Sequence, residues 1–235
     1  MIKQDISGLL KANTYPGRGI IVGLSEDGAR SVLVYFIMGR SENSRNRIFV
    51  ETAGGIRTEA FDPEKLIDPH LVIYNSIIYI NGLTIVTNGL QTDTIVDFLN
   101  EGRGFYNALY EWEFEPDPPI YTPRISAIIN SDGSYSLSIL KSADGDPICC
   151  CRHFYNYSTA IAGSGHFIST YKSDGNPPPS FNGEPVCVAI DRGYRELADT
   201  VWDALDEDNK VALYVCEMDI KTDKKESIII NKLLR

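Results

Sequence analysis

The residues best suited to chemistry form the arginine loop, residues 39–47, which follows an apolar run. It carries three guanidinium groups, on Arg40, Arg45 and Arg47, with small polar side chains between them. The preceding run, residues 31–38, reads as a buried strand, so the loop begins where a rigid scaffold can aim side chains at a ligand. A planar guanidinium grips phosphate or carboxylate through two parallel hydrogen bonds. The loop is therefore a candidate anion site, and the alternative is an ordinary solvated loop.

Three more polar clusters lie at the ends of expected strands or helices: Tyr74-Asn75, residues 88–94 and residues 115–124. Unpaired amide N–H groups at the start of a helix favour anions, so residues 88–94 could hold a phosphate or ribose. The alternative is that Thr92 only caps its helix. In the third cluster, turn geometry and a surface ion pair would explain Pro123 and Arg124 equally well.

The composition bounds the class of protein. At 235 residues with 43% hydrophobic content, the chain is expected to fold as one domain over residues 1–235. Its formal net charge of -10 argues against duplex nucleic acid or an anionic membrane as the main partner, but leaves room for a local basic pocket that takes a small phosphorylated metabolite. No stretch approaches the ~20 apolar residues of a membrane helix, and the start lacks a secretory pattern, so we expect a cytoplasmic protein.

The cysteines and histidines do not predict a metal centre. The five cysteines are the run at 149–151 with Cys187 and Cys216, which fits neither zinc spacing nor an even disulfide framework. We interpret them as reduced strand residues. The histidines, His70, His153 and His166, show no ligand spacing either; His166 could line a site, although a plain loop position is favoured.

The apolar pattern predicts antiparallel strands with helices outside them. Two hairpins are expected at 71–87 and 125–140, with turns at Asn81-Gly82 and 131–133. Further strands are expected at 19–24, 31–38, 47–52, 186–190, 211–218 and 226–233, and helices at 93–100, 104–112 and 191–205. Such an order favours an α+β layered domain. The proline-rich patch at 175–179 reads as a surface loop near a site, and residues 219–235 could complete a sheet.

Taken together, these segments resemble the archaeal-type inosine monophosphate (IMP) cyclohydrolase family. The shared landmarks, in order, are residues 15–23, the arginine loop, 73–77, 87–89 with 92–95, 115–117 leading to 122–125, and 167–171. The resemblance covers most of the chain. It implies a four-layer αββα sandwich like the N-terminal nucleophile hydrolase fold. It also implies ring closure of 5-formamidoimidazole-4-carboxamide ribotide to IMP, the last step of purine synthesis, with no cofactor and no metal.

The resemblance also implies roles for individual residues. Arg47, Tyr74 and Glu115 match the catalytic arginine, tyrosine and glutamate of the family. The arginine loop is about two residues longer than the archaeal form, so the choice between Arg45 and Arg47 stays open. The candidates for binding the substrate are Arg40, Ser41, Asn43, Ser44, Arg45, Asn46, Asn75, Asn88, Thr92, Asp93 and Arg124.

Ring closure makes demands that these side chains can meet. A carboxamide nitrogen is a poor nucleophile and a formamide a poor electrophile, so the enzyme must hold them in contact and stabilise charge on the formyl oxygen. We expect Arg47 to polarise that oxygen, Glu115 to accept a carboxamide proton, and Tyr74 to donate or relay a proton as hydroxide leaves. The alternatives are a non-catalytic purine-nucleotide-binding protein and a small-amide hydrolase; a homo-oligomer is possible with any of them. Met1-Ile2 offers no N-terminal nucleophile, so amidase activity of that type is not expected.

Overall fold

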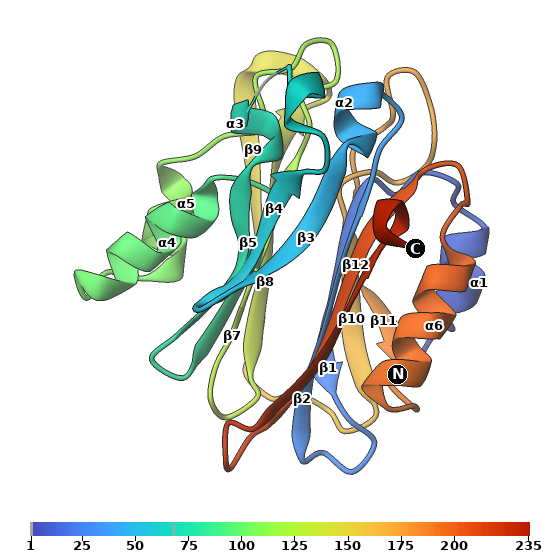
Figure 1. The fold of residues 1–235 in the computed structure, drawn as a ribbon. Helices are drawn as coiled ribbons and strands as arrows, with labels where there is room; N and C mark the ends of the chain where they lie inside the picture. Colours follow the sequence, from blue (N-terminus) through green and yellow to red (C-terminus); the bar gives the residue numbers. More distant parts are fainter. Residues whose placement is uncertain (1, 68) are drawn as a thin grey trace.

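Two antiparallel sheets make up the centre of the molecule in the computed structural model, which describes residues 2–67 and 69–235 (Figure 1). The six-stranded sheet has the order β11-β10-β1-β2-β12-β13, and the seven-stranded sheet has the order β3-β4-β5-β6-β7-β8-β9. The strands of the first are β1 (Arg18–Leu24), β2 (Arg30–Met38), β10 (Ser164–Ser169), β11 (Val186–Ala189), β12 (Lys210–Asp219) and β13 (Lys225–Asn231). Those of the second are β3 (Arg47–Thr52), β4 (Gly55–Ala60), β5 (Tyr74–Ile80), β6 (Leu83–Thr87), β7 (Arg124–Ile129), β8 (Tyr135–Ala143) and β9 (Asp146–Tyr157).

Helices cover the outer face of each sheet (Figure 1). The pair α4 (Gln91–Asn100) and α5 (Phe105–Tyr110) lies against the seven-stranded sheet, whereas α1 (Ile6–Lys11) and α6 (Tyr194–Ala204) lie against the six-stranded one. The shorter helices are α2 (Glu42–Arg45), α3 (Pro69–Val72), η1 (Pro63–Lys65) and η2 (Lys232–Leu234). No helix among the described residues is long and apolar enough to cross a membrane.

Alternation along the strands builds three apolar cores. Successive side chains of a strand point to opposite faces. On β2, Val34 and Phe36 therefore join the core under α1 and α6, while Leu33, Tyr35 and Ile37 join the core between the two sheets. A third core lies under α4 and α5. Because β2 is buried on both faces, it appears in the sequence as an unbroken apolar run.

The two hairpins are confirmed at their turns. Asn81 and Gly82 have φ values of 51° and 74°, and Gly133 has a φ of 82°, conformations that asparagine and glycine tolerate best. The C-terminal segment adds β13 at the edge of the six-stranded sheet, as expected. The five cysteines lie on strands, as the sequence indicated: the run at 149–151 on β9, Cys187 on β11 and Cys216 on β12.

Other expectations need correction. Strands β4 and β10 were not expected, because their polar residues hide the apolar alternation, and of β9 only the cysteine run was interpreted as strand. His166 lies on β10 and contacts Tyr135, so the favoured loop position was wrong. The arginine loop contains helix α2, and α4 begins at Gln91 with Leu90 as its N-cap. Thr92 therefore lies inside the helix and does not cap it.

Candidate active site

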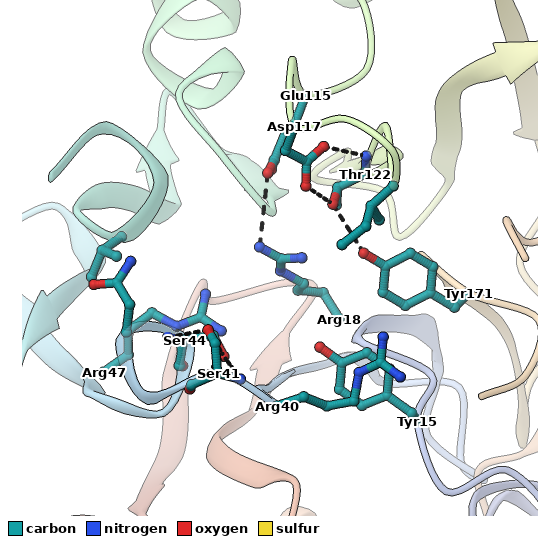
Figure 2. Close-up of a pocket in the computed structure, with 13 residues that line it drawn as sticks. Tyr15, Arg18, Arg40, Ser41, Ser44, Arg47, Glu115, Asp117, Thr122 and Tyr171 are labelled. Atoms are coloured by element: carbon teal, nitrogen blue, oxygen red, sulfur yellow. Dashed lines mark hydrogen bonds and ion pairs between the residues drawn. The ribbon is translucent and has the colours of Figure 1, made fainter. Parts of the chain in front are cut away.

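The candidate site is a cavity of about 320 Å³ at the end of the molecule where β1, β3, β5 and β7 begin and where β2 and β10 end (Figure 2). A volume of this size suits a small-molecule ligand. Antiparallel pairing brings these strand ends together although they are far apart in the sequence. The lining residues are Tyr15, Arg18, Arg40, Ser41, Asn43, Ser44, Arg47, Val72, Glu115, Asp117, Ile120, Thr122 and Tyr171.

Helix α2 gives the arginine loop a fixed shape. The Ser44 amide donates to Ser41 Oγ at 3.1 Å, and the Ser41 amide donates to Ser44 Oγ at 3.0 Å, which is a reciprocal capping arrangement. Four of the candidates for binding the substrate line the cavity: Arg40, Ser41, Asn43 and Ser44. Arg45 does not, because its Nε donates to Gly39 O at 3.0 Å and its Nη2 lies 3.4 Å from Asn209 Oδ1, outside the cavity.

Arg47, the first residue of β3, is 1% exposed and lines the cavity. Its Nε donates to Ser44 O at 2.7 Å and its Nη2 donates to Met38 O at 3.0 Å, so two backbone carbonyls fix the guanidinium plane. Burial, followed by repulsion from Arg18, lowers the pKa of Arg47 below its ordinary value. Of the two arginines that the sequence left open, Arg47 is the one that meets the cavity.

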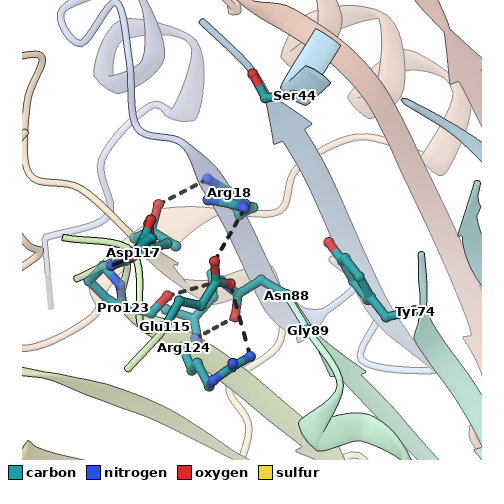
Figure 3. Close-up of polar contacts among 12 residues, drawn as sticks. Arg18, Ser44, Tyr74, Asn88, Gly89, Glu115, Asp117, Pro123 and Arg124 are labelled. Atoms are coloured by element: carbon teal, nitrogen blue, oxygen red, sulfur yellow. Dashed lines mark hydrogen bonds and ion pairs between the residues drawn. The ribbon is translucent and has the colours of Figure 1, made fainter. Parts of the chain in front are cut away.

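Glu115 lies between two guanidinium groups (Figure 3). It is 4% exposed; Oε2 is 4.0 Å from Arg18 Nη2, and Oε1 is 4.0 Å from Arg124 Nη1. Both contacts exceed hydrogen-bond length, so the carboxylate oxygens keep their accepting capacity. Burial raises the pKa of Glu115, and the charges of Arg18, Arg124 and Arg47 oppose that rise without cancelling it. A buried carboxyl group with a raised pKa and free oxygens is suited to accept a proton.

Arg18, the first residue of β1, is a site residue that sequence reasoning did not assign. Burial lowers its pKa, but the Glu115 carboxylate and the nearby phenols outweigh burial and raise it above the ordinary value. The feature that could have identified Arg18 is its position as the one charged residue of β1, at the start of a strand that is otherwise apolar and buried. Gly17, before it, has a φ of 78°, and a Cβ there would lie 2.2 Å from Thr170 Oγ1 and 2.5 Å from the Tyr171 ring. Only glycine permits this close approach.

Tyr74, the first residue of β5, is 3% exposed and lies beside the cavity. Its hydroxyl is 3.0 Å from the hydroxyl of Tyr35. Burial lowers the pKa values of Arg18, Arg47 and Arg124, and the Tyr74 phenol opposes this effect in each; the pKa values of Arg47 and Arg124 remain below the ordinary value. The structure therefore gathers the predicted trio, with the arginine and glutamate in the cavity lining and the tyrosine next to it.

The remaining candidates at or near the start of α4, Asn88, Thr92 and Arg124, do not line the cavity but hold the segments next to it in place. Asn88 Nδ2 donates to Pro123 O at 2.9 Å, and its Oδ1 accepts from the Ile125 amide at 2.8 Å, so its amide ties two loops together. The Thr92 hydroxyl is hydrogen-bonded to the Thr87 hydroxyl, with the two Oγ1 atoms 2.6 Å apart. Arg124 donates to Gln91 Oε1 at 3.0 Å, and its contact with Glu115 makes it a supporting cation rather than a lining residue.

The last three candidates also lie outside the lining. Asn46 exchanges hydrogen bonds with the backbone of Asp62, at 2.7 Å and 2.8 Å, and so closes the loop after β4. Asn75 donates to Asp93 at 2.8 Å on the surface. We assign none of these three side chains to the cavity, because their polar groups are engaged elsewhere.

Two tyrosines that were assigned no role from the sequence line the cavity on the side of β10. Tyr15 and Tyr171 stack with ring centroids 5.6 Å apart, and Arg40 lies 4.4 Å from the Tyr15 ring. The Tyr171 hydroxyl is 2.9 Å from Thr122 Oγ1, which donates to Asp117 at 2.6 Å. Burial raises the pKa of Tyr171 to about 12. Both tyrosines lie in segments that carry the family resemblance, which was the signal for finding them.

The charge of the cavity is opposite to that of the chain. Three arginines and two acids line it, with Arg124 behind Glu115, on a protein whose net charge is -10. Buried guanidinium groups in excess over carboxylates attract a small anion and orient it through paired hydrogen bonds. The cavity therefore has a charge suited to a small anion, and it contains a buried carboxyl group suited to proton transfer.

Comparison with known proteins shows the family of this chain. Residues 15–224 match the model of the family described as IMP cyclohydrolase-like protein, and the chain belongs to that family.

The similar relatives are archaeal proteins named IMP cyclohydrolase. The one from Methanopyrus kandleri is 30% identical over 122 residues, which are 50% of this chain and 60% of the relative. The one from Methanosphaera stadtmanae is 30% identical over 131 residues, 54% of this chain and 63% of the relative. The one from Methanococcus aeolicus is 26% identical over 125 residues, which are 52% of this chain and 61% of the relative. The matches thus span about three-fifths of the length of these relatives.

Proposed function

We propose that this protein is an IMP cyclohydrolase, which closes 5-formamidoimidazole-4-carboxamide ribotide to IMP with loss of water. The observation that carries the proposal is the buried Glu115, whose two oxygens form ion pairs of 4.0 Å, beyond hydrogen-bond length, with Arg18 and Arg124, in the cavity that Arg47 also lines. Membership of the family and the names of the relatives support the same activity.

The reaction requires a carbon–nitrogen bond to form and a carbon–oxygen bond to break. The carboxamide nitrogen attacks the formyl carbon, and Arg47 stabilises the negative charge that develops on the formyl oxygen. Glu115 accepts the proton that this nitrogen loses. Counted in full, the formyl oxygen takes up two protons, one from the carboxamide nitrogen and one from the formamide nitrogen, and leaves as water. Tyr74 donates or relays the proton that accompanies this departure.

The phosphate of the nucleotide is assigned to the side of the cavity formed by the arginine loop. Arg40, Ser41, Asn43 and Ser44 line that part and offer a guanidinium group, hydroxyls and an amide. Such groups hold a phosphate with direct hydrogen bonds. The reaction is a neutral dehydration, so these side chains suffice without a metal or cofactor.

The finer structural and cellular assignments are also proposals. We propose that the order of layers, helices outside two stacked antiparallel sheets, is that of the N-terminal nucleophile hydrolase fold (Figure 1). We also propose that the protein acts in the cytoplasm on its small nucleotide substrate. The cationic cavity on an acidic chain supports a small anion as ligand and gives no support to nucleic acid.

One assay tests the proposed function. Purified protein is incubated with the ribotide without added metal, and the appearance of IMP is followed by absorbance and chromatography. We expect catalytic conversion at a rate proportional to protein concentration. Binding of IMP without conversion would identify a nucleotide-binding protein, and release of product from simple amides alone would identify an amide hydrolase.

A further inference from the structure

Two tyrosines, one from each sheet, meet next to the cavity: Tyr35 of β2 and Tyr74 of β5, with hydroxyl oxygens 3.0 Å apart. We propose that Tyr35 is a positioning residue that donates its hydroxyl proton to Tyr74 and so leaves the Tyr74 proton directed at the cavity. This inference rests on the proposed function, in which Tyr74 handles the proton that leaves with water.

The surroundings of Tyr35 offer its hydroxyl proton one acceptor among the described residues, the Tyr74 hydroxyl. The side chain is 0% exposed and belongs to the apolar core between the sheets, where its ring packs on Phe49 with centroids 5.4 Å apart. Among the described residues, the Tyr74 hydroxyl is the hydrogen-bond partner of the Tyr35 hydroxyl. A buried hydroxyl with no acceptor for its proton destabilises the folded protein, because the hydrogen bond to water that it makes in the unfolded chain is lost.

The direction of the hydrogen bond follows from counting donors and acceptors. If Tyr74 donated, the Tyr35 proton would have no acceptor among the described residues, because the other charged groups near its phenol, Arg18 and Arg47, carry donors only. If Tyr35 donates, every hydroxyl proton has an outlet, because Tyr74 borders the cavity. Burial also raises the pKa of Tyr35 far above its ordinary value, so this hydroxyl keeps the proton that it shares.

The other neighbours of Tyr74 determine where its own proton goes. Among the described residues, the charged groups that its phenol affects are the guanidinium groups of Arg18, Arg47 and Arg124, and a guanidinium has donors but no acceptor. The acceptor for the Tyr74 proton must therefore be a group in the cavity, which in the proposed reaction is the departing hydroxyl of the substrate. As that proton leaves, the hydrogen bond from Tyr35 stabilises the charge developing on the Tyr74 oxygen, and the proton from the formamide nitrogen restores the phenol.

The fold supplies a matched control for this pair. Tyr79 of β5 and Tyr214 of β12 join the same two sheets through hydroxyls 2.7 Å apart, and neither residue lines the cavity. In the six-stranded sheet Tyr214 is the register partner of Tyr35. Substituting Tyr79 by Phe therefore removes an equivalent bond between the sheets without touching Tyr74.

The test is a double-mutant cycle on turnover of the ribotide. Tyr35→Phe is expected to lower kcat about tenfold, because the donor is mispositioned, with KM and the Kd for IMP unchanged. In the Tyr74→Phe background the same substitution is expected to change kcat no further. Tyr79→Phe is expected to keep the wild-type kcat. A wild-type kcat for Tyr35→Phe, or equal effects of that substitution in both backgrounds, would overturn the inference.

A second cycle, on thermal unfolding, reports the direction of the bond without using activity. Tyr74→Phe strands the Tyr35 proton and should lower the unfolding midpoint, and adding Tyr35→Phe should restore part of that loss. A double variant less stable than Tyr74→Phe alone would contradict donation by Tyr35. If the wild-type protein made no IMP, the proposed function would fail, while this unfolding cycle would still decide the direction of the bond.

Discussion

At the scale of single residues, Glu115 carries the strongest prediction. Glu115→Gln removes the proton acceptor while keeping the shape, so kcat should fall on the order of 10²-fold. Glu113→Gln is the matched control, since that carboxyl group is 61% exposed and lies near Arg152. Steady-state turnover measures both, and a wild-type kcat in Glu115→Gln would remove this residue from the mechanism.

The raised pKa of Glu115, which burial causes, predicts the pH dependence. A raised pKa means that the carboxyl group takes up a proton, and stops being a base, at a higher pH than an ordinary glutamate. The acid limb of kcat/KM should therefore lie above about 4.3, the usual glutamate value. It should disappear from the residual activity of Glu115→Gln. An acid limb at or below the ordinary value would show that the base is solvated or is another group.

The two arginines that the sequence could not separate give a paired prediction. Arg47→Lys cannot reproduce the planar fork held by Ser44 O and Met38 O, so kcat should fall about 10²-fold. Arg45→Lys should stay near wild type, because Arg45 faces Asn209 outside the cavity. Turnover measurements on both variants decide, and the reverse pattern would move the catalytic role to Arg45.

Residue types and the family resemblance together predicted part of this site. Arg40, Arg47 and Glu115 could be found because charged groups at strand ends and the family landmarks agree on them. Arg18 and Tyr171 could not be assigned, since their place in the cavity depends on pairing β1 with β10 across almost 150 residues of sequence. Asn88 failed as a ligand candidate for a different reason, namely that a buried amide near a site is often consumed by loop closure.

At the scale of elements, hairpins and helices could be predicted from the sequence more reliably than strands rich in polar residues. The Asn81-Gly82 turn specifies its hairpin locally, because both residues accept positive φ values. Strand β9 has no such local signal, since one edge is unpaired and its residues are mostly exposed or half-buried. The strand forms because it pairs with β8, and the local composition of a segment does not show which strand it will pair with.

The turn before β1 gives a prediction on stability. Gly17→Ala forces a Cβ into Thr170 and Tyr171 at a φ of 78°, so it should destabilise the protein by about 2 kcal/mol or more. Gly54→Ala is the control, because a Cβ at Gly54 meets nothing within 4 Å. Denaturant unfolding of both variants measures the difference, and equal stability would show that the turn relaxes freely.

The proline-rich loop restrains the proposed phosphate end of the cavity. Arg40 Nη1 donates to Asp174 Oδ1 at 2.7 Å and to Gly175 O at 2.8 Å, which confirms that the loop lies near the site. Asp174 therefore competes with an incoming anion for this guanidinium. Asp174→Asn should lower the Kd for IMP about threefold, the modest effect of a partly exposed pair. Asp191→Asn, whose carboxylate pairs with Arg192, should leave the Kd unchanged; a weaker affinity in Asp174→Asn would contradict competition.

At the scale of the whole molecule, two stacked sheets bring distant strand ends to one cavity and give it a charge unlike the rest of the chain. Net charge and length predicted a folded acidic protein with room for a local basic pocket. They could not place that pocket, because its position follows from the sheet order, with β1 between β10 and β2 and with β3 to β9 forming the opposite sheet.

The most direct test of the central claim is a crystal structure of the protein with IMP bound. We predict the phosphate at Arg40 and the helix α2 serines, and the ring carbon that derives from the formyl group beside Arg47 and Glu115, with the Tyr74 hydroxyl within about 3.2 Å of the nucleotide or of one bridging water. A nucleotide bound outside this cavity, or bound in it with the phosphate against Glu115, would contradict the account.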